Sequence, residues 1–269
     1  MKKWIGAVLA MLLLSASVRA ADQPAAADAE KERIRSMVKE VLREYAASLG
    51  PKALNADARG IMQNLGQDNR NFMRTHKAAY FKPFVDGQHP RATVITCADS
   101  RVHSHAFDAT PDGDLFMIRN IGNQISTAEG SVEFGIHHLH TPLLLIVGHS
   151  ACGAIKAAAA DYSGESGPIK NELDSIQIPK GESGMSSILL NVHNQVKYAM
   201  AKFEEKVISG ELVIVGAIYD FRDDLKQGQG KLAIVNVNGE TDAKKLGQLE
   251  IVQATEQAAP RTRRNPMDH

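Results

Sequence analysis

Short, almost continuously apolar runs after Pro90 are the feature that most restricts the fold of this chain. Such runs are typical of strands buried on both faces, as in a parallel sheet that helices cover. Helical patterns over residues 129–140, 152–161 and 186–209 separate the later runs, which indicates successive βαβ units. The four apolar runs are residues 92–96, 115–118, 143–147 and 212–215.

A fifth apolar run, residues 232–237, follows the fourth after a short connection. Because a parallel crossover needs a longer connection, this run predicts an antiparallel edge strand. With 269 residues, 43% of them hydrophobic, the chain is long enough to bury one sizeable core. We therefore predict an α/β fold with a mainly parallel central sheet of four parallel strands, an antiparallel edge strand and flanking helices.

Two helical patterns precede the sheet. Apolar residues recur at helical spacing between Ile34 and Tyr45, and the Gly50-Pro51 pair ends that helix. A second helical pattern covers residues 56–76. Later in the chain, residues 162–185 are rich in glycine, serine and proline, which predicts an irregular excursion from the fold.

The N-terminal twenty residues match the pattern of a signal peptide. Lys2 and Lys3 precede an apolar stretch over residues 4–14, and small residues precede Ala21. We expect export to a bacterial periplasm, with secretion as the second choice. We expect no membrane anchor after cleavage, because the stretch is short for a bilayer and no cysteine follows the cleavage site. The predicted divisions are a signal peptide at 1–20, a flexible leader at 21–30, a single α/β domain at 31–259 and a disordered tail at 260–269.

The charge balance argues against two kinds of partner, nucleic acid and a membrane surface. The chain has 31 basic and 31 acidic residues, and removal of Lys2, Lys3 and Arg19 leaves 28 basic against 31 acidic, a net charge of −3. The chain therefore lacks the excess of basic residues that would favour binding to nucleic acid or to a membrane surface.

The two cysteines of the chain, Cys97 and Cys152, each follow an apolar run, and His149 lies three residues before Cys152. In open α/β sheets, ligands bind beyond the carboxyl ends of the strands, where the strand order switches. If the first and third strands are neighbours, these three side chains converge. Two thiolates and one imidazole are a donor set for zinc, and they leave the fourth tetrahedral position to water. The sequence therefore predicts a catalytic zinc site.

Two alternatives use the same residues. In an oxidising compartment, two cysteines ordinarily predict a Cys97–Cys152 disulfide, but that bond leaves His149 without a role. A thiol enzyme built on Cys152 and His149 leaves Cys97 without one. Zinc content and a free-thiol count distinguish these alternatives from the zinc site.

Asp99 and Arg101 lie two and four residues after Cys97, so an extended segment places both side chains on one side. Arg101 would hold Asp99 ionised, and the carboxylate could then accept a hydrogen bond from zinc-bound water. Zinc with two thiolates carries no net charge, so such an acceptor helps to hold hydroxide near pH 7.

The order Cys97-x-Asp99-x-Arg101 and then His149-x-x-Cys152-Gly153 resembles the β class of carbonic anhydrases. The resemblance extends over roughly residues 69–221. Further similar segments are residues 113–123, 131–134 and 216–221.

The resemblance implies a zinc enzyme (a lyase) that hydrates carbon dioxide reversibly to bicarbonate and a proton. Cys97, His149 and Cys152 would hold one Zn²⁺ per subunit, with zinc-bound hydroxide as the nucleophile. Asp99 would orient the hydroxide while paired with Arg101, or would bind zinc in a closed, inactive state.

The resemblance also implies the substrate-binding residues. Gln88 would hydrogen-bond the substrate, and Phe116, Ile121 and Phe134 would form the apolar wall of the carbon dioxide cleft, with Gly153 beside Cys152. Phe134 stands where many family members carry tyrosine, which removes a hydroxyl and keeps the wall.

In the family a neighbouring subunit closes this cleft. The resemblance therefore implies a homodimer or a higher homo-oligomer, in which the N-terminal helix around residues 34–45 clasps the partner subunit.

Two other activities remain open at this point. The same zinc site would serve the hydrolysis of carbonyl sulfide or carbon disulfide, which needs the same nucleophile. A non-catalytic exported protein that binds zinc or bicarbonate is the alternative from another class, although an intact Asp99–Arg101 pair argues against it.

Overall fold

The structure is a computed structural model that describes residues 24–49 and 56–257. The chain divides into two compact units, one ending at Tyr80 and one beginning at Phe81. The predicted signal peptide, residues 1–20, and the predicted tail, residues 260–269, lie outside the described residues.

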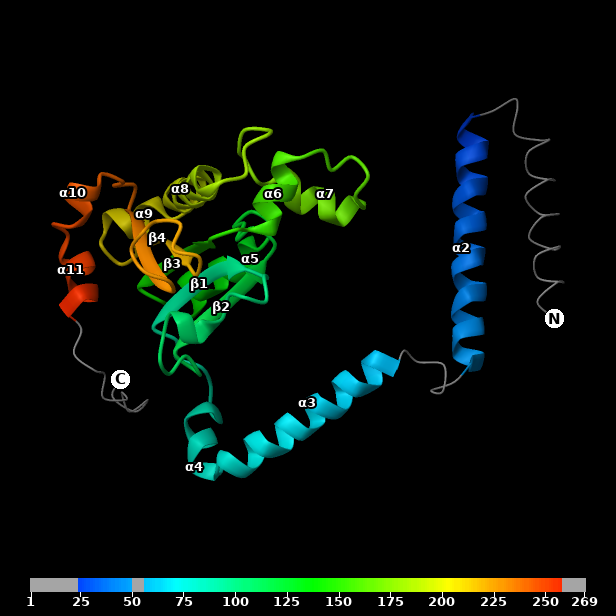
Figure 1. Ribbon diagram of the computed structural model, residues 1–269, viewed down its shortest axis with the longest axis horizontal. Helices are drawn as coiled ribbons and strands as arrows, with labels where there is room; N and C mark the ends of the chain where they lie inside the picture. The colour runs from blue at the N-terminus through cyan, green and yellow to red at the C-terminus, as the bar shows by residue number, and fades with distance from the viewer. Residues whose placement is uncertain (1–23, 50–55, 258–269) are drawn as a thin grey trace. The chain divides into compact units, whose positions relative to one another are not determined.

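In the described residues of the first unit there are two long helices, α2 (Pro24–Leu49) and α3 (Ala56–Thr75) (Figure 1). Helix α2 begins inside the segment predicted as a flexible leader, because alanine has the highest helix propensity and proline is tolerated in a first turn. The apolar residues of both helices are largely exposed. Those with at least 50% exposure are Met37, Val41, Leu42, Tyr45, Ile61, Met62, Leu65 and Met73.

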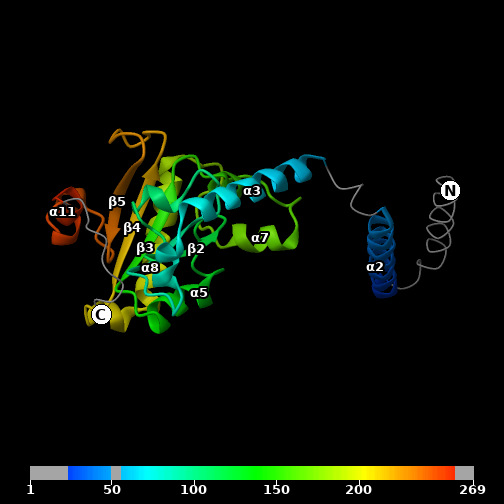
Figure 2. The same ribbon diagram turned by 90° about the horizontal axis from the view of Figure 1, so that it is seen from below.

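The second unit is built on a mixed sheet, and in the described residues its strand order is β2-β1-β3-β4-β5 (Figures 1 and 2). Strand β1 pairs in parallel with β2 and β3, β3 pairs in parallel with β4, and β5 is antiparallel to β4. The predicted α/β fold is confirmed, including the antiparallel edge strand. The strands are β1 (Ala92–Cys97), β2 (Leu115–Asn120), β3 (Leu143–His149), β4 (Val213–Asp220) and β5 (Lys231–Val237).

The three helical patterns predicted between strands are all found. The pattern over 186–209 forms two helices because the backbone leaves the helical region at Phe203. None of the helices in the described residues has the length and apolar character that a membrane span requires. The remaining helical elements are α4 (Ala78–Phe81), η2 (Lys82–Phe84), η3 (Ser104–Ala106), α5 (Glu129–Glu133), the π-helical turn η4 (Phe134–His138), α6 (Gly153–Ala159), α7 (Gly167–Asp174), α8 (Met185–Lys202), α9 (Glu204–Ile208), α10 (Ala243–Leu246) and α11 (Glu250–Gln257).

The segment 162–185, predicted as irregular, contains the helix α7. Pro168 is the second residue of this helix, a position where proline's missing N–H is not needed and its fixed φ suits the helix. Leu173, 1% exposed, attaches the helix to the core. Proline here begins a helix, whereas the composition of the segment indicated only a loop.

The sheet is covered on both faces. On one face, Ile95, Ile146 and Ile214 pack with residues of α8 in the main core cluster. On the other face, Val94 and Val147 pack with the segment after β1, while α10 and α11 cover the β4–β5 side (Figure 2). The sequences of the strands are almost continuously apolar because both faces of the sheet are covered.

Helix α8 lies so close to β4 that only glycine fits at residue 216. A Cβ atom there would lie 2.8 Å from Val192 Cγ1 and 2.9 Å from Val196 Cγ2, and β-branched side chains cannot turn aside easily. We predict that Gly216→Ala lowers the free energy of unfolding by about 1–3 kcal/mol in urea titrations. The control is Gly130→Ala on α5, where a Cβ meets nothing within 4 Å. This change should raise stability slightly, since alanine favours helix. Equal stabilities of the two variants would contradict the prediction.

Candidate metal centre

The sheet topology places the ends of β1 and β3 side by side. Strand β2 lies on one side of β1 and β3 on the other, so the strand order switches between them. Cys97 is the last residue of β1 and His149 is the last residue of β3. The two parallel strands end at the same edge of the sheet, and both side chains lie where α/β proteins place their ligands.

A tight turn brings Cys152 to the same point. Between β3 and α6, Ala151 has a φ of 52°, a left-handed conformation that non-glycine residues rarely adopt. The N–H of Ser150 donates to the Tyr219 carbonyl at 3.1 Å, which ties the start of the turn to β4. Cys152 then occupies the N-cap of α6 with an extended backbone, so its side chain is directed to the strand ends.

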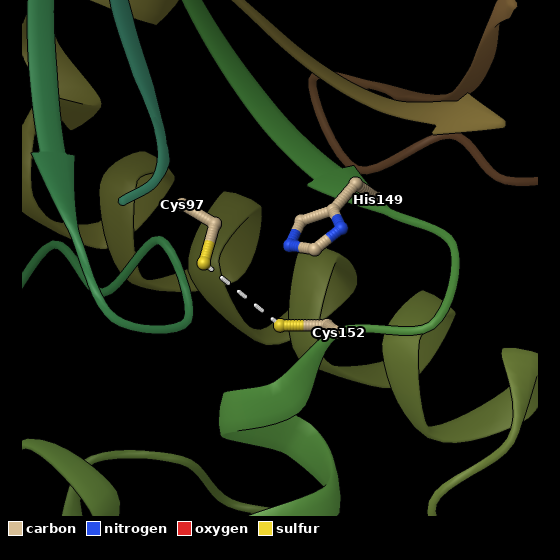
Figure 3. Close-up of side chains that lie close together, drawn as sticks. All are labelled: Cys97, His149 and Cys152. Atoms are coloured by element: carbon tan, nitrogen blue, oxygen red, sulfur yellow. Dashed lines mark hydrogen bonds between the residues drawn. The ribbon is translucent and has the colours of Figure 1, made fainter. Parts of the chain in front are cut away.

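Cys97, His149 and Cys152 converge in a buried cluster (Figure 3). One ligand atom from each residue lies within 4.8 Å of the others, and the two Sγ atoms are 4.0 Å apart. The three residues are 4%, 0% and 4% exposed. Both cysteines are free thiols, since a disulfide would bring the sulfurs to about 2.05 Å. In the described residues this is the one group of three such side chains close enough to hold a metal ion.

His149 presents an unused lone pair to this cluster. Its Nδ1 atom lies 3.0 Å from the Ser150 carbonyl, and a carbonyl oxygen only accepts, so Nδ1 carries the proton. Nε2 is buried and has no hydrogen-bond partner in the described part of the chain. Two thiols and an orphaned imidazole nitrogen are a donor set that zinc favours. The side chains present therefore fit a zinc ion.

The pKa values of the two thiols shift in opposite directions. The pKa of Cys97 is lowered, mainly because the Cys152 thiol donates a hydrogen bond to it, and burial opposes this. The pKa of Cys152 is raised by the same hydrogen bond and by burial. Thiolate ligands bind a metal by releasing their protons, so a divalent cation would displace the proton that the pair retains.

Asp99 is held by Arg101 through a two-pronged ion pair. Arg101 donates from Nε to Oδ1 at 2.9 Å and from Nη2 to Oδ2 at 2.6 Å, and its backbone N–H donates to Oδ1 at 3.0 Å. The Arg101 guanidinium also donates to the Ala151 carbonyl at 3.1 Å and lies over the Phe221 ring at 4.8 Å. The Oδ2 atom of Asp99 lies 4.0 Å from His149 Nε2. The carboxylate thus borders the cluster while both of its oxygens bind arginine.

The electrostatics of the pair follow from this geometry. The Arg101 side chain, above all, holds the pKa of Asp99 well below its usual range, and burial opposes the shift. Asp99 in turn raises the pKa of Arg101. Asp99 is therefore ionised at every pH near neutrality, and it can act only as a hydrogen-bond acceptor there.

Two residues around the site were not found from the sequence. Arg119 on β2 donates to the carbonyls of Cys97, Asp99 and Val102 at 3.0, 2.7 and 2.8 Å, so it fixes the loop after β1. Phe221 stacks beside the His149 ring at 6.0 Å and beneath Arg101. A single arginine at the end of an otherwise apolar strand was the available signal for Arg119. Phe221 ends the segment 216–221 that resembles the family, but nothing in the sequence indicated that its ring contacts His149 and Arg101.

The predicted substrate residues lie on several elements. Phe116 on β2 and Phe134 at the start of η4 bring their rings to 5.9 Å, and Phe134 is 42% exposed. Ile121, half-buried, follows β2, and Gly153 is the first residue of α6. Gln88 is exposed in the segment before β1. The structure therefore places Phe116 and Phe134 together.

Comparison with known proteins agrees with this architecture. A family model described as "Carbonic anhydrase" matches residues 92–229. Carbonic anhydrase 2 of Mycobacterium tuberculosis is 32% identical over 151 residues, which cover 51% of this chain and 73% of that protein.

Two solved structures share the fold. The β-carbonic anhydrase CcaA superimposes with a TM-score of 0.56 at 22% identity, covering 68% of this chain and 89% of that one. A structure from a report on two tetrameric β-carbonic anhydrases of Sordaria macrospora gives a TM-score of 0.53 at 22% identity, covering 68% of this chain and 98% of that one.

The Asp99–Arg101 pair predicts a pH effect. A depressed folded-state pKa adds stability that is fully present above the unfolded value, near 3.9, and is lost as pH falls toward the folded pKa. We predict that Arg101→Gln raises the Asp99 pKa in carboxyl NMR titrations. The variant should also lose less stability than the wild type on acidification below about pH 4. Arg222→Gln, which removes the exposed pair with Asp224, is the control and should leave the Asp99 pKa in place. An unchanged Asp99 pKa in Arg101→Gln would refute the assigned cause.

Proposed function

This chain belongs to the β class of the carbonic anhydrase family, and on that premise we propose that it hydrates carbon dioxide reversibly to bicarbonate and a proton at one zinc ion per subunit. The proposal depends above all on one observation. Two buried thiols and the imidazole of His149, whose Nε2 has no hydrogen-bond partner among the described residues, meet where β1 and β3 end, with one ligand atom from each residue within 4.8 Å of the others.

Cys97, His149 and Cys152 would hold the zinc ion. Three protein ligands are the number that catalytic zinc sites use, which leaves a coordination position for water. When bound, zinc supplies the Lewis acidity that makes a water nucleophilic near neutral pH. The hydrogen bond from His149 Nδ1 to the Ser150 carbonyl fixes the tautomer and the ring orientation that this role needs.

Asp99 would accept the hydrogen bond of the attacking water and so orient it. Arg101 keeps the carboxylate ionised, and the Arg101 contacts to Ala151 and Phe221 keep the guanidinium in place. Both oxygens of Asp99 accept hydrogen bonds from Arg101, which supports a role for the carboxylate as an acceptor rather than as a metal ligand. Ligation of zinc by Asp99 in a closed state would require those bonds to break.

Phe116, Ile121 and Phe134 would form an apolar wall for carbon dioxide, and Gln88 would hydrogen-bond the substrate. The contact between the Phe116 and Phe134 rings and the exposure of Phe134 support an apolar surface open to a small molecule. Carbon dioxide is small and apolar, so an apolar surface with few polar groups suffices to bind it. Gly153 would add a backbone N–H at the start of α6.

The protein would act as a homo-oligomer, a dimer or larger. The exposed apolar residues of α2 and α3 support this, because apolar area of that extent favours burial against a partner. The Sordaria macrospora proteins that share the fold are described as tetrameric. The chain would work after export to the periplasm, on the basis of the charged and apolar pattern of residues 1–20.

Loss of one thiol ligand tests the zinc site. We predict that wild-type protein holds one zinc per chain by elemental analysis, and that chelation removes both zinc and stopped-flow carbon dioxide hydration. Loss of a residue that only supports a metal ligand lowers metal affinity by roughly 10–100-fold. Cys152→Ser removes a ligand itself, so it should lower zinc affinity by more than that. The control is His140→Asn, a change of an exposed histidine with a φ of 53° to a residue that tolerates this conformation. It should keep full zinc. Full zinc occupancy in Cys152→Ser would remove that residue from the ligand set.

Asp99→Asn separates metal binding from catalysis. The amide keeps the size of the side chain but loses the charge, so we predict normal zinc content and a fall in kcat of about 10²–10⁴-fold. Asp161→Asn is a matched control, because Asp161 accepts a backbone N–H from two residues along, as Asp99 does, but lies beyond the end of α6. Carbon disulfide hydrolysis measured in parallel would reveal a different preferred substrate. Turnover of Asp99→Asn near the wild-type rate would rule out the proposed role.

A further inference from the structure

A chain of buried amide side chains lies between α8 and the loop that follows β2. Gln124, Asn191 and Gln195 are 0%, 1% and 6% exposed. A buried amide costs free energy unless its hydrogen bonds are made. Gln195 Nε2 donates to Gln124 Oε1 at 2.9 Å, and Gln124 Nε2 donates to Asn191 Oδ1 at 2.8 Å. The three amides thus form a connected network inside the core.

This network ends on the carbonyl of Gly122. Asn191 Nδ2 donates to that oxygen at 3.0 Å, and Gln124 Nε2 donates to it at 2.6 Å. Both lone pairs of the carbonyl are used, so the orientation of this peptide is fixed. Glycine is required here, because φ is 81° and a Cβ would lie 2.7 Å from Ile176 Cδ1.

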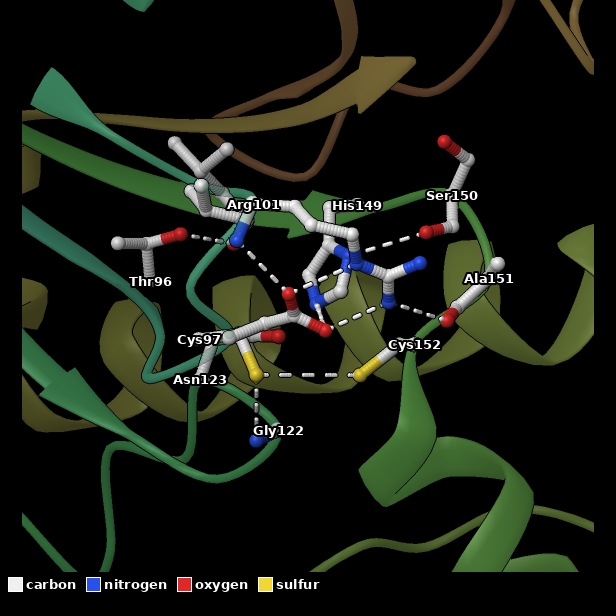
Figure 4. Close-up of polar contacts among 12 residues, drawn as sticks. Thr96, Cys97, Arg101, Gly122, Asn123, His149, Ser150, Ala151 and Cys152 are labelled. Carbon is white, nitrogen blue, oxygen red and sulfur yellow. Dashed lines mark hydrogen bonds and ion pairs between the residues drawn. The ribbon is translucent and has the colours of Figure 1, made fainter. Parts of the chain in front are cut away.

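The backbone N–H of Gly122 faces the metal centre. Its N–H donates to Cys97 Sγ at 3.5 Å (Figure 4). A side chain on α8 is therefore connected through one glycine residue to a sulfur of the cluster. A hydrogen bond to a ligand atom orients it and adjusts the charge that it offers to a metal.

We propose that Asn191 is a positioning residue of the metal centre: it holds Gly122 so that the Gly122 N–H binds Cys97 Sγ. The inference rests on the zinc site of the proposed function. Gln195 supports the same network from one residue further away, because its amide bonds Gln124 and the Ile125 N–H but not Gly122.

The zinc affinity of the full chain, measured by competition with a chromophoric chelator, tests the proposal. Asn191→Leu should lower zinc affinity about 10–100-fold, which is the range seen when a residue that hydrogen-bonds a metal ligand is lost. In the cobalt-substituted variant, the sulfur-to-cobalt charge-transfer absorption should shift, because Cys97 Sγ loses its fixed orientation. Neither readout depends on turnover. Zinc affinity within about twofold of the wild type, with an unchanged cobalt spectrum, would overturn the proposal.

Two matched variants separate positioning from general stability. Gln195→Leu removes a buried amide of the same network but no bond to Gly122, so it should lower unfolding stability with a much smaller loss of zinc affinity. Asn194 lies on the same helix, and its side-chain amide donates to the Gln177 carbonyl at 2.8 Å. Asn194→Leu should therefore leave zinc affinity unchanged. Equal losses of zinc affinity in Asn191→Leu and Gln195→Leu would show loosening of the core and would overturn the proposal.

A measurement on the wild-type chain tests the proposal even if Asn191→Leu does not fold. With cadmium-113 in the site, the Gly122 amide proton should show scalar coupling to the metal through Cys97 Sγ. Absence of that coupling would contradict the hydrogen bond on which the proposal depends. Wild-type zinc content separates the two levels of inference. A chain that binds no zinc fails both, whereas a zinc-loaded wild type with an unaffected Asn191→Leu fails only the positioning role.

Discussion

Parallel pairing of β1 with β3 is the constraint on which the rest of this structure depends. The pairing sets Thr96 opposite Val147, so the two strands reach the same edge of the sheet together. Cys97 and His149 then meet although they lie far apart along the chain, and the tight turn through Ala151 adds Cys152. The site needs no long loop to assemble it, because hydrogen bonding between strands determines where its side chains lie.

Burial sets the chemistry of the cluster. Cys97, His149 and Cys152 are almost entirely removed from water, and a buried thiolate is costly unless positive charge or N–H groups face it. The chain supplies the Gly122 N–H to Cys97 and the Ser150 carbonyl to His149, but within residues 24–49 and 56–257 no group hydrogen-bonds His149 Nε2. A divalent cation would neutralise two thiolates and use that nitrogen. The Asp99–Arg101 pair lies at the border of this buried cluster, where the Asp99 side chain is 17% exposed and the Arg101 side chain 48% exposed.

The sequence predicted the parts of the fold that periodicity encodes. Continuous apolar runs identified the strands, the short connection identified the antiparallel edge, and the ends of two runs identified Cys97 and His149. It did not predict α7, because Pro168 looks the same in a helix start as in a loop. Arg119 and Asn191 act on backbone carbonyls, and a sequence does not show where a carbonyl points. Gln88 and Phe134 were identified by resemblance, since neither spacing nor composition marks a substrate wall.

The 4.0 Å separation of the two sulfur atoms makes the order of maturation steps important. A displacement of about 2 Å would bring them to bonding distance, and one oxidation would then consume both ligands. A metal ion bound to the sulfurs keeps them apart and occupies the electron pairs that an oxidant attacks. In an oxidising compartment, acquisition of the metal therefore competes in time with cross-linking. In such a compartment, a chain that is oxidised before it binds a metal ion would lose both thiol ligands in one step.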